Sequence, residues 1–215
     1  MDTNIPLYEF QRSLPFYPMV LNYTVLLLAI KEFGAAGIAL HLKSLPDAEY
    51  QKELAEAKIQ GNVELVERLK AASVEELYPQ LVLVSEFQDQ HINIDAFATM
   101  RELGTNIAFL VDDLKLSAVL ALLVHAYEAT KRIYTPEPLW EFLYHCRNAG
   151  AHGGRFTFRN GQPRYPAKWG RYTLSRATHE GMPLIIHKGI PGLFGTGDPL
   201  RLLWDIEQRY IVPTL

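Results

Sequence analysis

The sequence is poor in cysteine and in apolar runs long enough to cross a bilayer. Its single cysteine, Cys146, excludes a framework of internal disulfides and indicates a reducing compartment, so a cytoplasmic protein is expected. The apolar stretches 19–30 and 116–127 are shorter than the roughly 20 residues of a membrane helix. Both are predicted to be buried helices, and no membrane partner is expected. The N-terminus carries Asp2 and Glu9 and lacks a basic lead-in to an apolar run, so no secretory signal is expected.

Common metal-binding and nucleotide-binding motifs are absent as well. The seven histidines and one cysteine show no metal-ligand spacing, and no His-Glu-x-x-His occurs. The glycine-rich stretch 189–197 matches neither a Walker loop nor a dinucleotide fingerprint, and no serine-hydrolase elbow is present. We therefore expect no metal and no cofactor.

Acidic residues are missing from one long segment. Between Phe142 and His179 there is no Asp or Glu, but seven of the 21 basic residues lie there, which leaves 14 basic against 24 acidic residues elsewhere. The net charge of −3 therefore hides a basic region that suits an anionic ligand.

Periodic apolar residues predict a long helix over 16–42, after an extended arm over 1–15. The predicted buried stripe consists of Leu21, Val25, Leu28, Ala35, Ala39 and Leu42. Helix caps and helix-forming residues predict four further helical segments, 44–60, 62–70, 73–90 and 95–103. The third is kinked or restarts at Pro79, because proline disturbs a helix interior.

The clearest helix is predicted over 113–134, where acids at the start and bases at the end match the helix dipole. Its predicted core face is Leu116, Leu120, Leu123 and Tyr127. Thr135-Pro136 is predicted to cap the next helix. Its buried face is Leu139, Phe142, Leu143 and Cys146, which places Trp140, Tyr144 and Arg147 on another face.

After Gly154 the pattern changes to alternation. Residues 155–159 alternate polar with aromatic or β-branched side chains, and Asn160-Gly161 predicts a hairpin. Short strands are expected within 169–174 and 184–187, and a final helix over 198–210. The predicted fold is mainly α, a helical bundle over 1–154. A basic β-hairpin extension and C-terminal helix over 155–215 pack on the same domain.

The most informative stretch is 144–154, which holds the only Arg-x4-His spacing in the chain, Arg147 and His152. Arginine pairs with phosphate through a planar fork of donors, and histidine moves protons near neutral pH, so the pair suits phosphodiester chemistry. Five positions along a helix separate two side chains by about 140°. We therefore expect Gly150 and Gly153 to loosen or end the helix and to bring His152 toward Arg147.

Arg147, Asn148 and His152, followed by glycine at the end of an amphipathic helix, resemble the Arg-Asn-x-x-x-His signature of the HEPN superfamily. The sharp resemblance covers residues 140–154. Members of that family are helical bundles, commonly dimeric, and many are metal-independent ribonucleases of toxin–antitoxin and defence systems. The resemblance implies a homodimer whose motif residues meet across the interface. Arg147 would bind the scissile phosphate, His152 would act in acid/base transfer, and Asn148 would orient the phosphate or hold His152.

One departure from the family concerns its partner. In members controlled by a nucleotidyltransferase antitoxin, a tyrosine stands two residues after the motif histidine, where this chain has Gly154. Control through that tyrosine is therefore not expected, and a different antitoxin protein, or none, stays open.

Residues 155–176 interleave basic and aromatic side chains, a mixture able to contact RNA phosphates and stack on bases. The predicted RNA-binding residues are Arg155, Arg159, Arg164, Lys168 and Arg171. In the alternative, the aromatic side chains pack against the bundle while the arginines are solvated or pair with acidic helices.

Simpler structural roles compete with the motif. Arg147 can pair with an acidic neighbour, Asn148 and Gly150 can end the helix, and His152 can lie in the loop. His145 is predicted to be a structural histidine. The sequence favours a metal-independent endoribonuclease over the alternative, a catalytically inactive HEPN-like module that binds RNA, a nucleotide or a protein partner.

Overall fold

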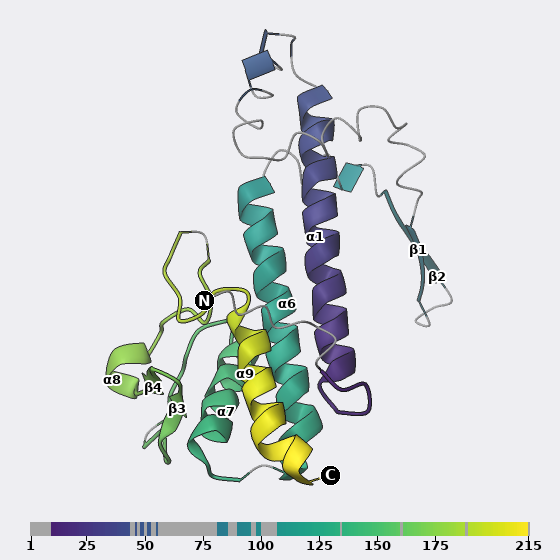
Figure 1. Cartoon of the computed structure of the whole chain (residues 1–215). Coiled ribbons are helices and arrows are strands. Elements are labelled where there is room, and N and C mark those ends of the chain that lie inside the picture. The colour runs from purple at the N-terminus through teal and green to yellow at the C-terminus, as the bar shows by residue number, and fades with distance from the viewer. Residues whose placement is uncertain are drawn as a thin grey trace. The chain divides into compact units, whose positions relative to one another are not determined.

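A computed structural model of the chain describes residues 10–43, 46, 48–49, 51–52, 55, 81–85, 90–95, 98–99, 107–133, 135–159, 161–187 and 189–214. The fold is mainly α, with few and short strands. Two compact units are present, Met1–Leu27 with Asp112–Leu215 and, between them, Leu28–Val111. Figure 1 labels the helices α1 (Tyr17–Lys43) and α6 (Ile107–Thr130). Each helix contains residues of both units. The predicted boundary at residue 154 is a change of secondary structure within the first of these units.

The second unit contains an antiparallel hairpin of β1 (Leu81–Ser85) and β2 (Gln90–Ile94), with Leu83 opposite Ile92. The helix predicted over 73–90 is therefore wrong at 81–85 and at Gln90, because β-branched valines in alternation outweigh the upstream capping signal. Asp95 accepts a hydrogen bond from the Ala98 amide at 2.9 Å, as expected of a helix start. The helices predicted over 44–60 and 62–70 lie largely or wholly outside the described residues.

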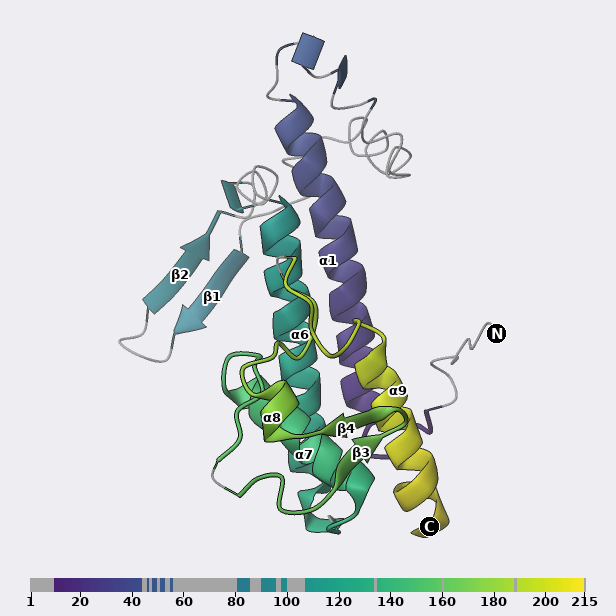
Figure 2. The ribbon, with the colours of Figure 1, turned by 90° about the vertical axis from the view of Figure 1, so that its left-hand side faces the viewer.

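The first unit holds the C-terminal part of α6 and η2 (Lys131–Ile133), followed by α7 (Pro138–Ala151). A hairpin of β3 (Ala167–Trp169) and β4 (Tyr172–Leu174) packs on α7 and leads to α8 (Arg176–His179) (Figure 2). The chain ends in α9 (Asp198–Ile206), a π-helical turn η3 (Glu207–Ile211) and η4 (Val212–Thr214). Among the described residues, no helix combines the length and apolarity needed to span a membrane.

Helix α1 confirms the predicted long helix but buries a different face. Val20 and Tyr23 are almost fully buried. Leu21, Val25 and Leu28 of the predicted stripe are instead 47%, 55% and 56% exposed. The helix carries apolar residues on all sides, so their spacing alone does not identify the buried side.

Helix α6 also buries a face that differs in part from the predicted one. Leu123 is buried as predicted, but Val119 and Ala126 complete the buried face, while Leu116 and Leu120 are only partly covered. The helix also begins at Ile107, before the acids that were expected to start it.

Helix α7 lies in the core of the first unit. The predicted buried face, Leu139, Phe142, Leu143 and Cys146, is confirmed. Trp140, predicted on another face, is also fully buried, with its ring 5.5 Å from that of Tyr210. Because other elements pack on more than one side of α7, residues outside the predicted buried face are buried as well. The helix starts at Pro138 with Glu137 as its N-cap, two residues after the predicted Thr135-Pro136.

The hairpin predicted around Asn160-Gly161 is wrong. Residues 155–159 form no strand, and their one ladder contact is an isolated bridge between Arg155 and Pro183. Pro163 and Pro166 lack the amide donors that a returning strand would need. The hairpin lies further along, at β3 and β4, where Gly170 has a φ of 52° in the turn.

Candidate functional site

The end of α7 brings the motif residues together. The helix continues through Gly150 and ends at Ala151, and His152 leaves helical geometry with φ −118° and ψ 42°. Gly153 and Gly154 follow with φ of 76° and 79°, values that favour glycine. The amide of Gly154 donates to the Ala149 carbonyl at 2.8 Å, which closes the helix end. On a continuous helix the side chains of Arg147 and His152 would point about 140° apart. Because the backbone leaves the helix at His152, that angle no longer applies to its side chain.

Close packing against α6 holds this helix end in place. A Cβ atom at Gly150 would lie 3.1 Å from Cγ2 of Val124, and one at Gly154 would lie 3.0 Å from Cδ1 of Leu116. Both contacts are tighter than ordinary van der Waals contacts, so the two glycines allow α7 to approach α6.

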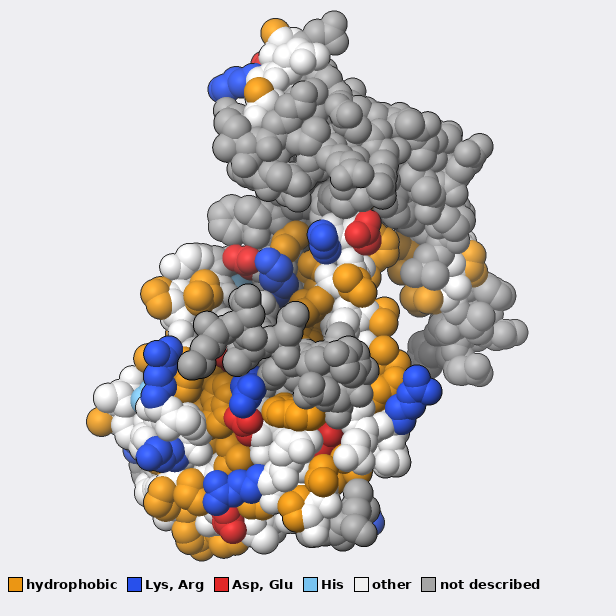
Figure 3. Space-filling model, viewed as in Figure 1, with side chains coloured by type: hydrophobic (Ala, Val, Ile, Leu, Met, Phe, Trp, Pro, Cys, Tyr) orange, Lys and Arg blue, Asp and Glu red, His pale blue; other side chains and the backbone are white. Residues whose placement is uncertain are grey.

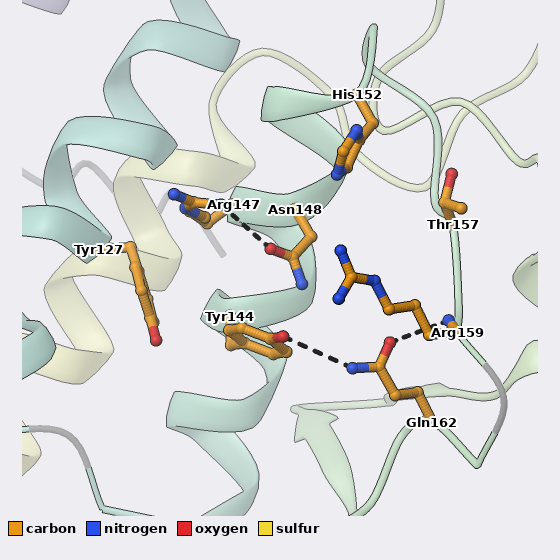
Figure 4. Close-up of a pocket in the computed structure, with 8 residues that line it drawn as sticks. All are labelled: Tyr127, Tyr144, Arg147, Asn148, His152, Thr157, Arg159 and Gln162. Carbon is orange, nitrogen blue, oxygen red and sulfur yellow. Dashed lines mark hydrogen bonds between the residues drawn. The ribbon is translucent and has the colours of Figure 1, made fainter.

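The motif residues line a cavity of about 310 Å³. Its walls are formed by Tyr127, Tyr144, Arg147, Asn148, His152, Thr157, Arg159 and Gln162 (Figure 4). The eight residues lie on α6, on α7 and on the segment that follows α7. No carboxylate is among these eight residues, so the charged groups that line the cavity are the two arginines, Arg147 and Arg159, with His152 beside them.

Arg147 is paired with Glu128 of α6, as the simpler structural reading predicted. Its Nε and Nη2 donate to Glu128 Oε1 at 3.2 and 2.7 Å, and its guanidinium lies 5.8 Å from the centre of the Tyr127 ring. Hydrogen bonds from Lys131 and Arg147 lower the pKa of Glu128, so the carboxylate is charged and offsets part of the positive charge of Arg147.

Asn148, His152 and Arg159 converge on the cavity. Nη1 of Arg147 donates to Asn148 Oδ1 at 3.3 Å, and this contact directs the Asn148 amino group toward the guanidinium of Arg159. The His152 ring points to the same space from the end of α7 (Figure 4). Within the described part of the chain, Arg159 makes no ion pair. An anion entering this space meets donors from three side chains.

The segment after α7 closes the cavity through a short turn. The backbone amide of Arg159 donates to the side-chain oxygen Oε1 of Gln162 at 3.0 Å. The backbone amide of Gln162 donates to the Arg159 carbonyl, also at 3.0 Å. Gln162 Nε2 lies 3.5 Å from the Tyr144 hydroxyl. This turn fixes the start of the Arg159 side chain relative to α7.

A second cavity, of about 320 Å³, adjoins the first. The two share Tyr127, Tyr144, Arg159 and Gln162, and the second adds Glu141, Arg164 and Tyr165. Burial raises the pKa of Tyr127, which keeps its hydroxyl protonated at neutral pH.

The five predicted RNA-binding residues separate into two groups. Arg159 and Arg164 line the cavities. Arg155 donates to the Gly181 carbonyl, Lys168 lies at another hollow beside Trp169, and Arg171 lies over the Tyr172 ring. On the face of the first unit shown in Figure 3, basic side chains are scattered among acidic and uncharged ones rather than gathered.

The aromatic side chains of residues 155–172 are mostly structural, as the alternative predicted. Phe156, Phe158 and Trp169 are buried, whereas Tyr165 is half exposed. The Phe158 ring lies 5.0 Å from that of His145, which is buried as a structural histidine should be. Burial also raises the pKa of the Cys146 thiol, so this cysteine is no ready nucleophile.

Sequence reasoning missed Glu128, Thr157 and Gln162. Tyr144 carried a signal, since it precedes Arg147 by three positions on one helix face. Glu128 carried none, because it lies 19 positions away on another helix. Across the described residues, no three His, Cys, Asp or Glu side chains gather as metal ligands would. Comparisons of the chain with family models, curated proteins and solved structures gave no match.

Proposed function

We propose that the chain is a metal-independent endoribonuclease of the HEPN type, related to toxins or defence proteins. One observation carries the proposal: Asn148, His152 and Arg159 converge on a cavity whose eight described lining residues include Arg147 and no carboxylate. Such a cavity attracts a phosphate and places a proton carrier beside it.

In the proposed reaction the ribose 2′ oxygen attacks the adjacent phosphorus, and the bond from phosphorus to the 5′ oxygen breaks. His152 accepts the proton of the 2′-hydroxyl, and the resulting imidazolium returns it to the departing 5′ oxygen, so protons balance. Asn148 and Arg159 donate hydrogen bonds to the phosphoryl oxygens as negative charge builds up. The products are a 2′,3′-cyclic phosphate and a 5′-hydroxyl.

Arg147 receives a positioning role in this proposal, in place of direct phosphate binding. Two of its donors contact Glu128, and a third holds the carbonyl of the Asn148 amide. We expect Arg147→Ala to reduce kcat strongly in the wild-type background but only slightly in an Asn148→Ala background. If the fold-reduction in kcat of the double variant equalled the product of the two single reductions, Arg147 would act independently of Asn148.

The ion pair of Arg147 with Glu128 favours a second candidate function, a catalytically inactive HEPN-like module that binds RNA, a nucleotide or a protein partner. The carboxylate offsets the charge of the motif arginine. Both candidates bind anions, and the ribonuclease alone turns substrate over.

The deciding experiment uses mixed cellular RNA in EDTA, with end-group analysis of the fragments. The wild type is compared with His152→Ala and with His125→Ala, which removes an exposed histidine of α6 outside the cavity. We expect the wild type and His125→Ala to leave 2′,3′-cyclic phosphates, and His152→Ala to be slower by about a hundredfold to ten-thousandfold. Intact RNA with folded wild type would support the binding module. Cleavage by His152→Ala at the wild-type rate would overturn the assigned site.

A mixing experiment tests whether the proposed homodimer shares the site between protomers. Arg147 and His152 of one chain line one cavity, so mixed Arg147→Ala and His152→Ala proteins should stay inactive. If the arginine of one protomer instead served the histidine of its partner, mixed dimers would restore about a quarter of wild-type activity, since half of all dimers would carry one intact site.

A further inference from the structure

We infer that the second cavity binds the nucleotide base next to the scissile phosphate, that this base is unpaired, and that bases with an exocyclic amino group are preferred. The inference rests on the proposed ribonuclease function, because that function places the phosphate in the first cavity. It adds a specificity site to the catalytic one.

The continuity of the two cavities is the first observation. Tyr127, Tyr144, Arg159 and Gln162 line both, and Figure 4 shows Tyr144 and Gln162 along one side of the first cavity. A base and its phosphate are joined through a single ribose, so a phosphate beside Arg159 leaves its base in the adjoining space. A base held within a duplex cannot enter a protein cavity, so the substrate is single-stranded there.

Tyr165 is the second observation. Its side chain is 50% exposed at the second cavity, and within the described chain it makes no ring contact. The Tyr144 ring, by contrast, packs 5.7 Å from Tyr127 and 5.1 Å from His145. An aromatic ring beside a groove with basic residues is the usual platform for stacking of an unpaired base.

Glu141 and Arg164 give the base preference. Glu141 lines the second cavity although its side chain is only 4% exposed, and its Oε1 lies 3.4 Å from His145 Nε2. A carboxylate accepts several hydrogen bonds, and Arg164 only donates. Adenine, cytosine and guanine each offer an exocyclic amino donor, whereas uracil offers only its ring N3–H, which lies between two carbonyl acceptors that a carboxylate repels.

The test uses DNA oligonucleotides with one ribonucleotide, so that each has a single cleavable bond, with A, C, G or U at that position. We expect the wild type to cleave after the three amino-bearing bases about tenfold or more faster than after uracil. Glu141→Gln introduces an amide donor and should shift the preference toward uracil. An unchanged order of preference in Glu141→Gln would remove Glu141 from base recognition.

Exposed residues provide variants whose folding is not at risk. Tyr165→Ala should raise KM by about tenfold through loss of stacking, and Tyr165→Phe should restore it. Arg164→Ala should also raise KM, whereas its matched control Arg171→Ala, outside both cavities, should not. Equal KM values for wild type and Tyr165→Ala would overturn the stacking role.

Binding without cleavage separates the two proposals. The probes are the nucleoside 3′-monophosphates of adenine, cytosine, guanine and uracil, titrated by calorimetry into wild type and Tyr165→Ala. Base-dependent binding that needs Tyr165, with no cleavage of any RNA, would leave the base site standing and overturn the ribonuclease. Cleavage at equal rates after all four bases, with no effect of Tyr165→Ala, would support the ribonuclease and overturn the base site.

Discussion

At the scale of single residues, Glu128 controls how much positive charge Arg147 presents to the cavity. Glu128→Gln leaves Arg147 without its counter-ion, so we expect tighter binding of a single-stranded oligonucleotide by about twofold to fivefold at low salt. The measurement is fluorescence anisotropy in a His152→Ala background, which prevents cleavage.

Lys131 supplies the control for that change. It also pairs with Glu128 but lies outside the cavity, so Lys131→Met removes a charge while leaving the pair of Arg147 and Glu128 intact. Weaker or unchanged binding by Glu128→Gln would show that the charge of Arg147 does not act on the ligand.

His145 makes stability depend on pH. Burial lowers its pKa, and Glu141 nearby opposes this effect only in part. The unfolded chain takes up a proton near pH 6.5 that the folded chain resists, so stability is full above that pH and falls below it. One such group costs up to about 1.4 kcal/mol per pH unit.

Urea unfolding at pH 7.5 and pH 5.0 checks this prediction. We expect the wild type to lose more stability between the two values than His145→Gln, whose side chain does not titrate. Because the substitution lowers stability at both pH values, the difference between them is the quantity to compare. Equal differences would show that another group causes the acid sensitivity.

Gly154 bears on the regulation of the proposed site. With φ of 79° and Leu116 Cδ1 3.0 Å from the place of a Cβ atom, a tyrosine two residues after the motif histidine would have a strained backbone and would press on Leu116. The structure thus gives a physical reason, independent of the family pattern, to expect no control through a tyrosine there.

At the scale of elements, the choice of buried face on α1 can be tested. Val20 is 1% exposed, so Val20→Ala should lower the free energy of unfolding by about 1–3 kcal/mol. Val25 belonged to the predicted stripe but is 55% exposed, so Val25→Ala should change it by less than about 0.5 kcal/mol. Chemical denaturation of both variants measures the difference, and the opposite ranking would restore the face expected from the sequence.

At the scale of the whole molecule, two of the five predicted RNA-binding residues lie at the cavities. Arg159 and Arg164 line the cavities, while Arg155, Lys168 and Arg171 lie elsewhere. With Arg159 at the phosphate and Arg164 at the base, a single phosphate contact with a single strand gives a slope of log affinity against log salt of about −0.7. We expect this shallow slope in anisotropy titrations of the His152→Ala protein.

The control for the salt dependence is a variant in which Arg155, Lys168 and Arg171 are all changed to alanine. It should keep the same slope, because none of the three lines either cavity. A slope near −3.5, lost in this variant, would show that all five predicted residues bind RNA together.

The sequence by itself determined the features set by neighbouring residues. Of the two glycines expected to end the helix, Gly153 lies at the end of α7, whereas the helix continues through Gly150. Apolar spacing predicted the buried Leu139, Phe142, Leu143 and Cys146, because caps and helix periodicity act within a few positions. Only the tertiary structure decided the rest. The contact of Arg147 with Glu128 and the approach of Arg159 to Asn148 join separate segments. The buried faces of α1 and α6 were equally undetermined, since helices that are apolar all round acquire a buried side only from what packs on them.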